Sequence, residues 1–263
     1  MLTPPDSLGL TLWSSDNPMN PRWLLPGLLL GLALISPAER VRAADAAPAK
    51  TLAEALTPEK WRQVENSVDR GLAWLATRQT PDGSFSTLAV GQPAVTSLCV
   101  MAFLSRGHQP GFGPYGQQLN RAIDFVLSCQ QEDGLFSYEV PQVYFQERQA
   151  SHTASYNHAI AGLMLGEVYG HVSGERAKKA RATMEKAISF TRALQVHPKK
   201  YAEDAGGWRY LQLKSPTASD ADLSVTAWQL MFLRSAKNAE FNVPQAWMDE
   251  GIAFCAPLLG SNN

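Results

Sequence analysis

The chain has 263 residues, of which 45% are hydrophobic, and its formal net charge is -1. This length and apolar content suit one domain with a continuous core. Phosphate backbones are bound by clustered basic surfaces, so the near-zero charge argues against a nucleic-acid partner. The three cysteines are scattered and lack Cys-x-x-Cys spacing, so the sequence predicts neither a zinc ribbon nor a redox motif.

The N-terminal part of the chain has the features of an export signal. A short positive segment precedes an apolar run, residues 23–35, which is too short to span a bilayer comfortably. Small residues up to Ala43 then form a cleavage site, which indicates a signal peptide at residues 19–43 and a periplasmic or extracellular protein. The alternative is an uncleaved membrane anchor. Membrane contact is expected only through this segment.

A pattern of helix and turn recurs along the rest of the chain. In the first two units a helix is followed by Gln-x-x-Asp-Gly-x-Phe, and all these positions are in register. A third unit has an insertion in its turn, and a fourth begins at Glu250. The shared positions are Gln79, Asp82, Gly83 and Phe85; Gln130, Asp133, Gly134 and Phe136; and Gln195, Gly207 and Trp208.

Each unit is predicted to be a helix with a turn fastened to its end. Glycine supplies a positive φ and aspartate a bond to the backbone, while glutamine can tie the turn to the helix. Trp74 lies at helical spacing among apolar residues and is predicted to be a core residue. Such a unit cannot bury its apolar face alone, so neighbouring units must stack.

Two kinds of helix alternate in this pattern. Amphipathic outer helices are predicted at about residues 58–79, 116–130, 174–195 and 244–258. Inner helices that are apolar on nearly all sides are predicted at Ala94–Leu104, Tyr156–Tyr169 and Leu223–Ala236. The predicted organisation is a mis-assigned N-terminal extension (1–18), a signal peptide (19–43), a flexible lead-in (44–57), a repeat domain (58–258) and a tail (259–263).

The repeat unit resembles the QW motif of the squalene cyclase and prenyltransferase superfamily, over about residues 58–258. Segments 156–163, 206–210 and 224–231 are also similar to those of exported, planctomycete-type squalene cyclase-like proteins, a group without an assigned activity. The resemblance implies an all-α fold, the terpenoid cyclase-like α/α toroid of concentric inner and outer helices. With about seven helices expected, we predict a partial toroid, which an oligomer could complete.

The resemblance also indicates where a catalytic acid would lie. Squalene cyclases protonate their substrate with an Asp-x-Asp-Asp-Thr-Ala segment, whose middle carboxyl needs a raised pKa. Here Ser224 takes the middle position, and a hydroxyl is too weak an acid for this reaction. Asp220 and Asp222 are therefore the candidates for a displaced acid, with helix N-capping as the alternative.

A metal site or cofactor is not predicted. The Asp-x-Cys pair with which protein prenyltransferases bind zinc does not occur, and the five histidines lack the spacing of metal ligands.

A polar cluster is expected at one mouth of the arc. Tyr156, Asn157 and His158 begin a predicted inner helix, and a polysaccharide lyase would need such a base and a charge neutraliser. The alternative is that Asn157 caps the helix and His158 binds a loop carbonyl. The candidates for ligand binding are Tyr138, Tyr156, Asn157, His158, Trp208 and Tyr210, with His158 also a candidate catalytic residue.

Three functions are compatible with the sequence. The intact repeat and the missing catalytic motifs favour a non-catalytic toroid that binds a hydrophobic or polymeric ligand or a partner protein. The alternatives are a terpene cyclase-like enzyme acting on an isoprenoid and a polysaccharide lyase or hydrolase. Fold-level resemblance cannot choose among them, because toroids host unrelated functions.

Overall fold

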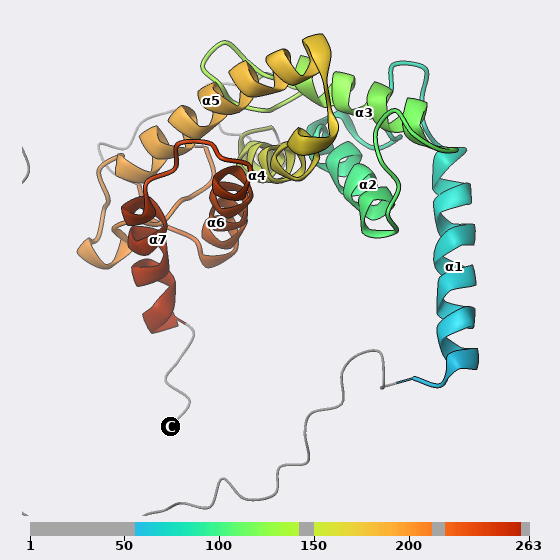
Figure 1. Ribbon diagram of the computed structural model, residues 1–263. Coiled ribbons are helices and arrows are strands. Elements are labelled where there is room, and N and C mark those ends of the chain that lie inside the picture. The colour runs from blue at the N-terminus through green and yellow to red at the C-terminus, as the bar shows by residue number, and fades with distance from the viewer. Residues whose placement is uncertain (1–55, 142–149, 212–218, 259–263) are drawn as a thin grey trace, which may run out of the picture. The chain divides into compact units, whose positions relative to one another are not determined.

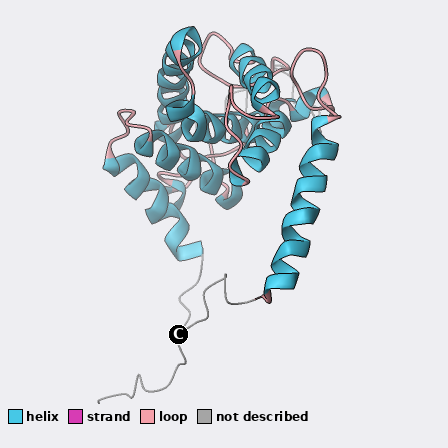
Figure 2. Cartoon of the chain, turned by 45° about the vertical axis from the view of Figure 1, so that its right-hand side comes forward, coloured by secondary structure: helices cyan, strands magenta, loops and turns pink. Residues whose placement is uncertain are grey.

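The computed structural model describes residues 56–141, 150–211 and 219–258. The predicted extension, signal peptide and tail, and all of the lead-in but its last two residues, lie outside the described residues. Within these ranges the chain is all-helical and contains no β-strand (Figures 1 and 2), which confirms the predicted all-α class. No helix of the described part is long and apolar enough to cross a membrane.

Seven α-helices are present in the described residues, and short 3-10 helices lie at Ala89–Gly91, Tyr169–His171 and Ala202–Asp204. The α-helices are α1 (Pro58–Ala76), α2 (Ala94–Ser105), α3 (Gly116–Ser128), α4 (Ala150–Val168), α5 (Gly174–Val196), α6 (Leu223–Asn238) and α7 (Gln245–Leu258).

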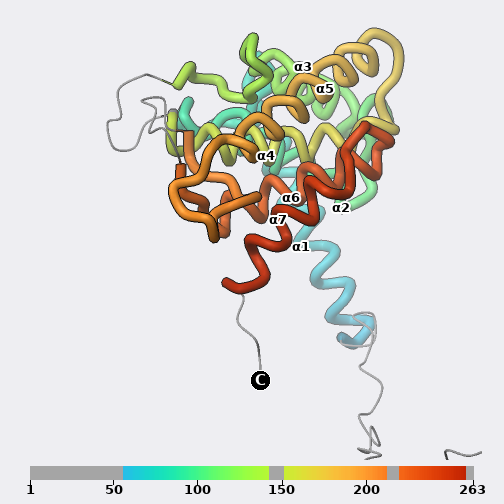
Figure 3. The backbone as a smooth tube through the Cα atoms, turned by 90° about the vertical axis from the view of Figure 1, so that its left-hand side faces the viewer, coloured from blue at the N-terminus to red at the C-terminus, as the bar shows by residue number. Residues whose placement is uncertain are grey.

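The helices form two layers. In the inner layer α4 packs between α2 and α6, and α3, α5 and α7 pack on α2, α4 and α6 respectively (Figure 1). In Figure 3, seen from the side that carries α7, α6 lies directly behind α7. Each of these outer helices thus covers the inner helix that precedes it in the chain, which follows the predicted alternation.

The inner layer is close-packed because α4 carries glycines where it crosses α6. A Cβ atom at Gly162 would lie 2.5 Å from the ring of Phe232, and one at Gly166 would clash with Ser235. The core between the layers is apolar and fully buried. Its largest side chains include Phe103, Leu119, Ile123, Phe136, Met164, Met184, Trp208 and Phe232.

Two sequence predictions about the helices are wrong. The inner helix α4 begins at Ala150 rather than at Tyr156, so Asn157 lies inside the helix and cannot cap it. Trp74, predicted to be buried, is 58% exposed and lies under the guanidinium group of Arg78 at 4.9 Å from the ring centroid.

Candidate functional site

Glutamine side chains fasten each repeat turn at two points. Gln79 Nε2 donates to the carbonyl oxygen of Gly83 in its own turn at 3.0 Å and to that of Gln118 in α3 at 2.8 Å. The other two units repeat both contacts: Gln130 with Gly134 and Thr183, and Gln195 with Gly206 and Trp247. Each glutamine therefore joins its turn to the next outer helix.

A glycine in each turn allows this close approach. Gly83, Gly134 and Gly206 have φ values of +93°, +99° and +83°, which glycine adopts without strain. A Cβ atom at Gly134 would lie 2.6 Å from the carbonyl oxygen of Lys186 in α5. In the third unit Gly206 occupies this position, so the prediction of Gly207 as the repeat glycine is wrong because the insertion obscured the register.

The aromatic residue of each turn is bonded to the following inner helix. Its backbone N–H donates to a side chain in all three units: Phe85 to Thr96 (3.0 Å), Phe136 to His158 (3.1 Å) and Trp208 to Thr226 (3.0 Å). His158 thus occupies the position that threonine holds in the other two units.

The structure contradicts a catalytic or ligand-binding role for His158. The side chain has no exposed surface, and burial lowers its pKa to about 3, so the imidazole is neutral. Nδ1 accepts from Phe136 N, which leaves the proton on Nε2 to be donated to Thr191 Oγ1 at 2.9 Å. His158 therefore accepts from a loop N–H, whereas the sequence suggested a bond to a loop carbonyl.

Two further predicted ligand-binding residues are buried structural residues. Asn157 accepts from Ala94 N at 3.3 Å and donates to Val90 O at 2.9 Å, which ties α4 to the start of α2. Trp208 is fully buried, and its indole N–H donates to Thr191 O at 2.9 Å. Neither side chain presents a surface to a ligand.

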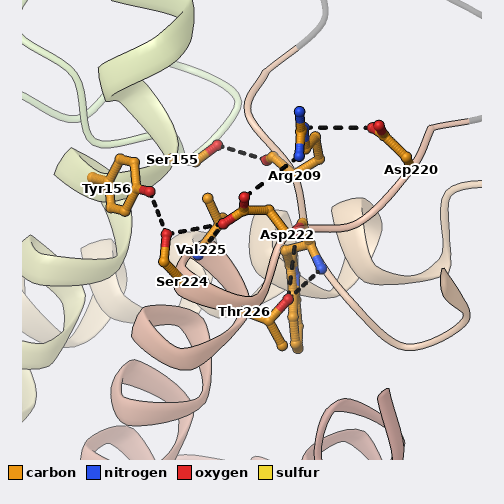
Figure 4. Close-up of polar contacts among 9 residues, drawn as sticks. Ser155, Tyr156, Arg209, Asp220, Asp222, Ser224, Val225 and Thr226 are labelled. Atoms are coloured by element: carbon orange, nitrogen blue, oxygen red, sulfur yellow. Dashed lines mark hydrogen bonds and ion pairs between the residues drawn. The ribbon is translucent and has the colours of Figure 1, made fainter. Parts of the chain in front are cut away.

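The remaining candidates meet in a polar cluster at the start of α6 (Figure 4). Tyr156 lies 2.5 Å from Ser224 Oγ, and Ser224 donates to Asp222 Oδ1 at 2.9 Å. Arg209 lies between the two aspartates, at 3.4 Å from both Asp220 Oδ1 and Asp222 Oδ2. The structure therefore joins Tyr156, Asp220 and Asp222 through residues of three separate segments.

Asp222 is the N-cap of α6, which confirms the alternative given for it. Its Oδ1 accepts from Val225 N at 2.9 Å. Partial burial would raise the pKa of Asp222, but the hydrogen bonds from Val225 and Ser224 and the charge of Arg209 outweigh it, and the pKa is lowered. The lowered pKa favours the ionised carboxylate, whereas a general acid that protonates an alkene needs a raised pKa.

Two tyrosines flank this cluster and a third lies elsewhere. The rings of Tyr156 and Tyr210 are 5.9 Å apart, and the guanidinium group of Arg209 lies 4.8 Å from the Tyr210 ring centroid. The hydrogen bond with Tyr156, together with burial, raises the pKa of Tyr210. Tyr138 is exposed and stacks on Phe125, with ring centroids 5.9 Å apart, and no contact with Tyr156, Arg209 or the aspartates is among its interactions in the described residues.

A pocket of about 650 Å³ opens beside Arg209 and Tyr210. Its apolar lining comes from the turn before α4, the second half of α5 and the segment before α6. The lining residues are Gln131, Glu132, Asp133, Leu135, Val140, Pro141, Phe190, Leu194, His197, Arg209, Tyr210, Leu211 and Ser219. Of the predicted ligand-binding residues only Tyr210 contributes, and the apolar lining was missed because its residues are far apart in the sequence.

The described residues contain no group of three or more His, Cys, Asp or Glu side chains placed to hold a metal ion. Burial raises the pKa of Cys129 to about 12 and that of Cys99 to about 11, so these two thiols are protonated at neutral pH.

A scan of the chain against models of protein families found no match, and a search of curated proteins also found none. The resemblance to the QW-motif superfamily is therefore carried by the repeat alone.

Proposed function

We propose that the protein is an exported, non-catalytic binding protein of the QW-repeat type, built as a partial α/α toroid. The toroid is supported by the alternation of inner and outer helices. It is also supported by three turns that share the same glutamine, glycine and aromatic contacts. Export rests on the predicted signal peptide at residues 19–43.

The observation that carries the proposal is that the candidate catalytic groups are held as parts of the scaffold. Asp222 is ionised and caps α6, and His158 is neutral and bonded on both ring nitrogens. Asp220 is paired with Arg209. A terpene cyclase requires a carboxyl that holds its proton until the substrate arrives, and the contacts of Asp222 favour its ionised form.

The ligand site that we propose is the pocket beside Arg209 and Tyr210. Its lining is mainly apolar and includes Leu135, Phe190 and Leu194. Arg209 is already paired with two carboxylates, and Glu132 and Asp133 also line the pocket. Because carboxylates outnumber the arginine among the described residues here, an uncharged molecule with an apolar body fits better than a diphosphate.

Isothermal titration of the mature protein with farnesol, farnesyl diphosphate and a neutral oligosaccharide tests this proposal. Farnesol is expected to bind with a negative heat-capacity change, the diphosphate at least tenfold more weakly, and the oligosaccharide not at all. Val140→Arg places a charge at the pocket and should weaken farnesol binding. Val196→Arg, also exposed but outside the pocket lining, should leave it unchanged.

The reverse preference, with the diphosphate or the oligosaccharide bound more tightly than farnesol, would contradict the assigned ligand class. Equal effects of Val140→Arg and Val196→Arg would contradict the assigned pocket.

A further inference from the structure

Helix α1 follows the same residue pattern as the later outer helices but buries less of it. Val68 is 40% exposed, whereas the residues at the same repeat position, Leu119 in α3, Met184 in α5 and Met248 in α7, are 1%, 0% and 5% exposed. Within the described residues, a large apolar residue at this position is therefore covered in three units and uncovered in the first.

Two neighbouring positions show the same difference. Trp74 is 58% exposed, whereas the matching Phe125 and Phe254 are 7% and 6% exposed and the matching Phe190 is partly buried. Gly71 has open space on its side-chain face, whereas the matching Ala122 is fully buried. These residues lie on one side of α1, which is the side that a preceding inner helix covers in α3, α5 and α7.

The three later helices also show what covers this side. An inner helix packs on each of them, and the preceding glutamine bonds to a carbonyl oxygen of Gln118, Thr183 or Trp247. In the repeat register all three residues correspond to Ser67 of α1. The preceding glycine packs on the carbonyl oxygen of Arg121, Lys186 or Glu250, and all three correspond to Arg70.

We propose that this side of α1, formed by Val64, Ser67, Val68, Gly71 and Trp74 and called the α1 seat, binds another polypeptide of the same repeat type. The bound part is a Gln-x-x-x-Gly-x-aromatic turn together with the apolar inner helix that follows it. The same interface occurs three times inside the chain, so its chemistry is known in detail. A second copy of this chain fits less well, because Gln79, Gln130 and Gln195 are all bonded internally.

The α1 seat goes beyond the proposed ligand site, from which it is separate. None of its residues lines the pocket beside Arg209 and Tyr210. The Val140→Arg variant is therefore expected to bind farnesol more weakly and to bind the polypeptide as the wild type does, so the two proposals can fail independently.

The test uses the full chain and a fluorescent synthetic peptide that covers residues 77–107, which contain the first turn and α2. In the chain this segment covers α3, and α3 shares its pattern with α1. Fluorescence anisotropy is expected to show saturable binding with one peptide per chain. Val68→Asp should weaken binding at least tenfold, because it places a charge on the apolar face. Val196→Asp, an equal change at an exposed valine of α5, should have no effect.

Peptide variants test the register of the contact. Gln79→Ala removes the amide that would reach Ser67, and Gly83→Val introduces a side chain where the backbone must approach Arg70. Both peptides are expected to bind at least tenfold more weakly than the parent peptide. Binding that both changes leave intact would overturn the proposal, as would a failure of the parent peptide to bind.

Sedimentation equilibrium of the full chain without peptide separates the proposed occupant from a second copy. A monomer is expected. A dimer that Val68→Asp dissociates and Val196→Asp does not would assign the α1 seat to self-association and would overturn the proposal.

Discussion

Replacing Gln195 with alanine tests whether the glutamine contacts hold the repeat units together. Gln195 is buried, and its Nε2 donates to Gly206 O at 3.1 Å and to Trp247 O at 2.8 Å. Its Oε1 accepts from Arg192 at 2.7 Å. The variant loses the contacts that join the third turn to α7.

The cost follows from these contacts. Each lost hydrogen bond contributes roughly 0.5–1.5 kcal/mol, and an acceptor left buried without a partner adds about 1–3 kcal/mol. Part of this free energy is recovered, because Trp247 O lies in the first turn of α7 and can accept a hydrogen bond from a backbone N–H of that helix. We expect Gln195→Ala to lower the free energy of unfolding by about 2–4 kcal/mol.

Urea unfolding followed by circular dichroism measures this difference. The matched control is Gln117→Ala, a glutamine that is exposed on α3, for which a change within about 0.5 kcal/mol is expected. If Gln195→Ala destabilised the protein no more than Gln117→Ala, the glutamines would not be the fasteners of the repeat.

Three further predictions concern the turns, the buried histidine and the cap of α6. Gly134→Ala should destabilise the protein by at least about 2 kcal/mol, because its Cβ meets Lys186 O. Gly107→Ala, with a similar positive φ and open space, should cost only about 1 kcal/mol in the same urea assay. The folded pKa of His158 is about 3, so the unfolded state binds more protons below pH 6.5. Stability should therefore fall by about 1.4 kcal/mol per pH unit as the pH drops from 6.5, and His158→Thr should remove that slope. Because the pKa of Asp222 is lowered on folding, its carboxylate stabilises the folded protein at a pH above the pKa of the unfolded state. This stabilisation is lost as the pH falls through the folded pKa. In Asp222→Asn the melting temperature should therefore fall less steeply than in the wild type as the pH is lowered. An unchanged pH dependence would contradict the N-cap role of Asp222.

The periodic features of the fold were predictable from the sequence. Helix existence and the alternation of amphipathic and apolar helices follow from local patterns such as Leu98–Leu104, and the turns from Gln, Asp-Gly and an aromatic residue in fixed order. The helix ends were less predictable. Gln79 and Gln130 lie beyond the ends of α1 and α3, whereas Gln195 lies inside α5, although all three side chains make the same bonds to their turns.

The candidate site was predictable only in part. The N-cap role of Asp222 was predictable, because an Asp before an apolar run is a local signal for a helix start. The role of His158 was hidden, since it lies 22 residues after Phe136, whereas Thr96 lies 11 residues after Phe85. Loops of different length between turn and inner helix conceal the shared position. The exposure of Trp74 was also hidden, because sequence periodicity does not show which positions of a helix are covered by neighbouring helices.

The central claim is that the protein binds an apolar ligand without converting it. Saturating the mature protein with farnesol, incubating it for many hours and analysing the recovered ligand by gas chromatography and mass spectrometry tests this claim most directly. We predict that farnesol is recovered unchanged from the wild type and from an Asp220→Asn, Asp222→Asn double variant that still binds it. A cyclised or hydrated product formed by the wild type and absent from the double variant would contradict the claim.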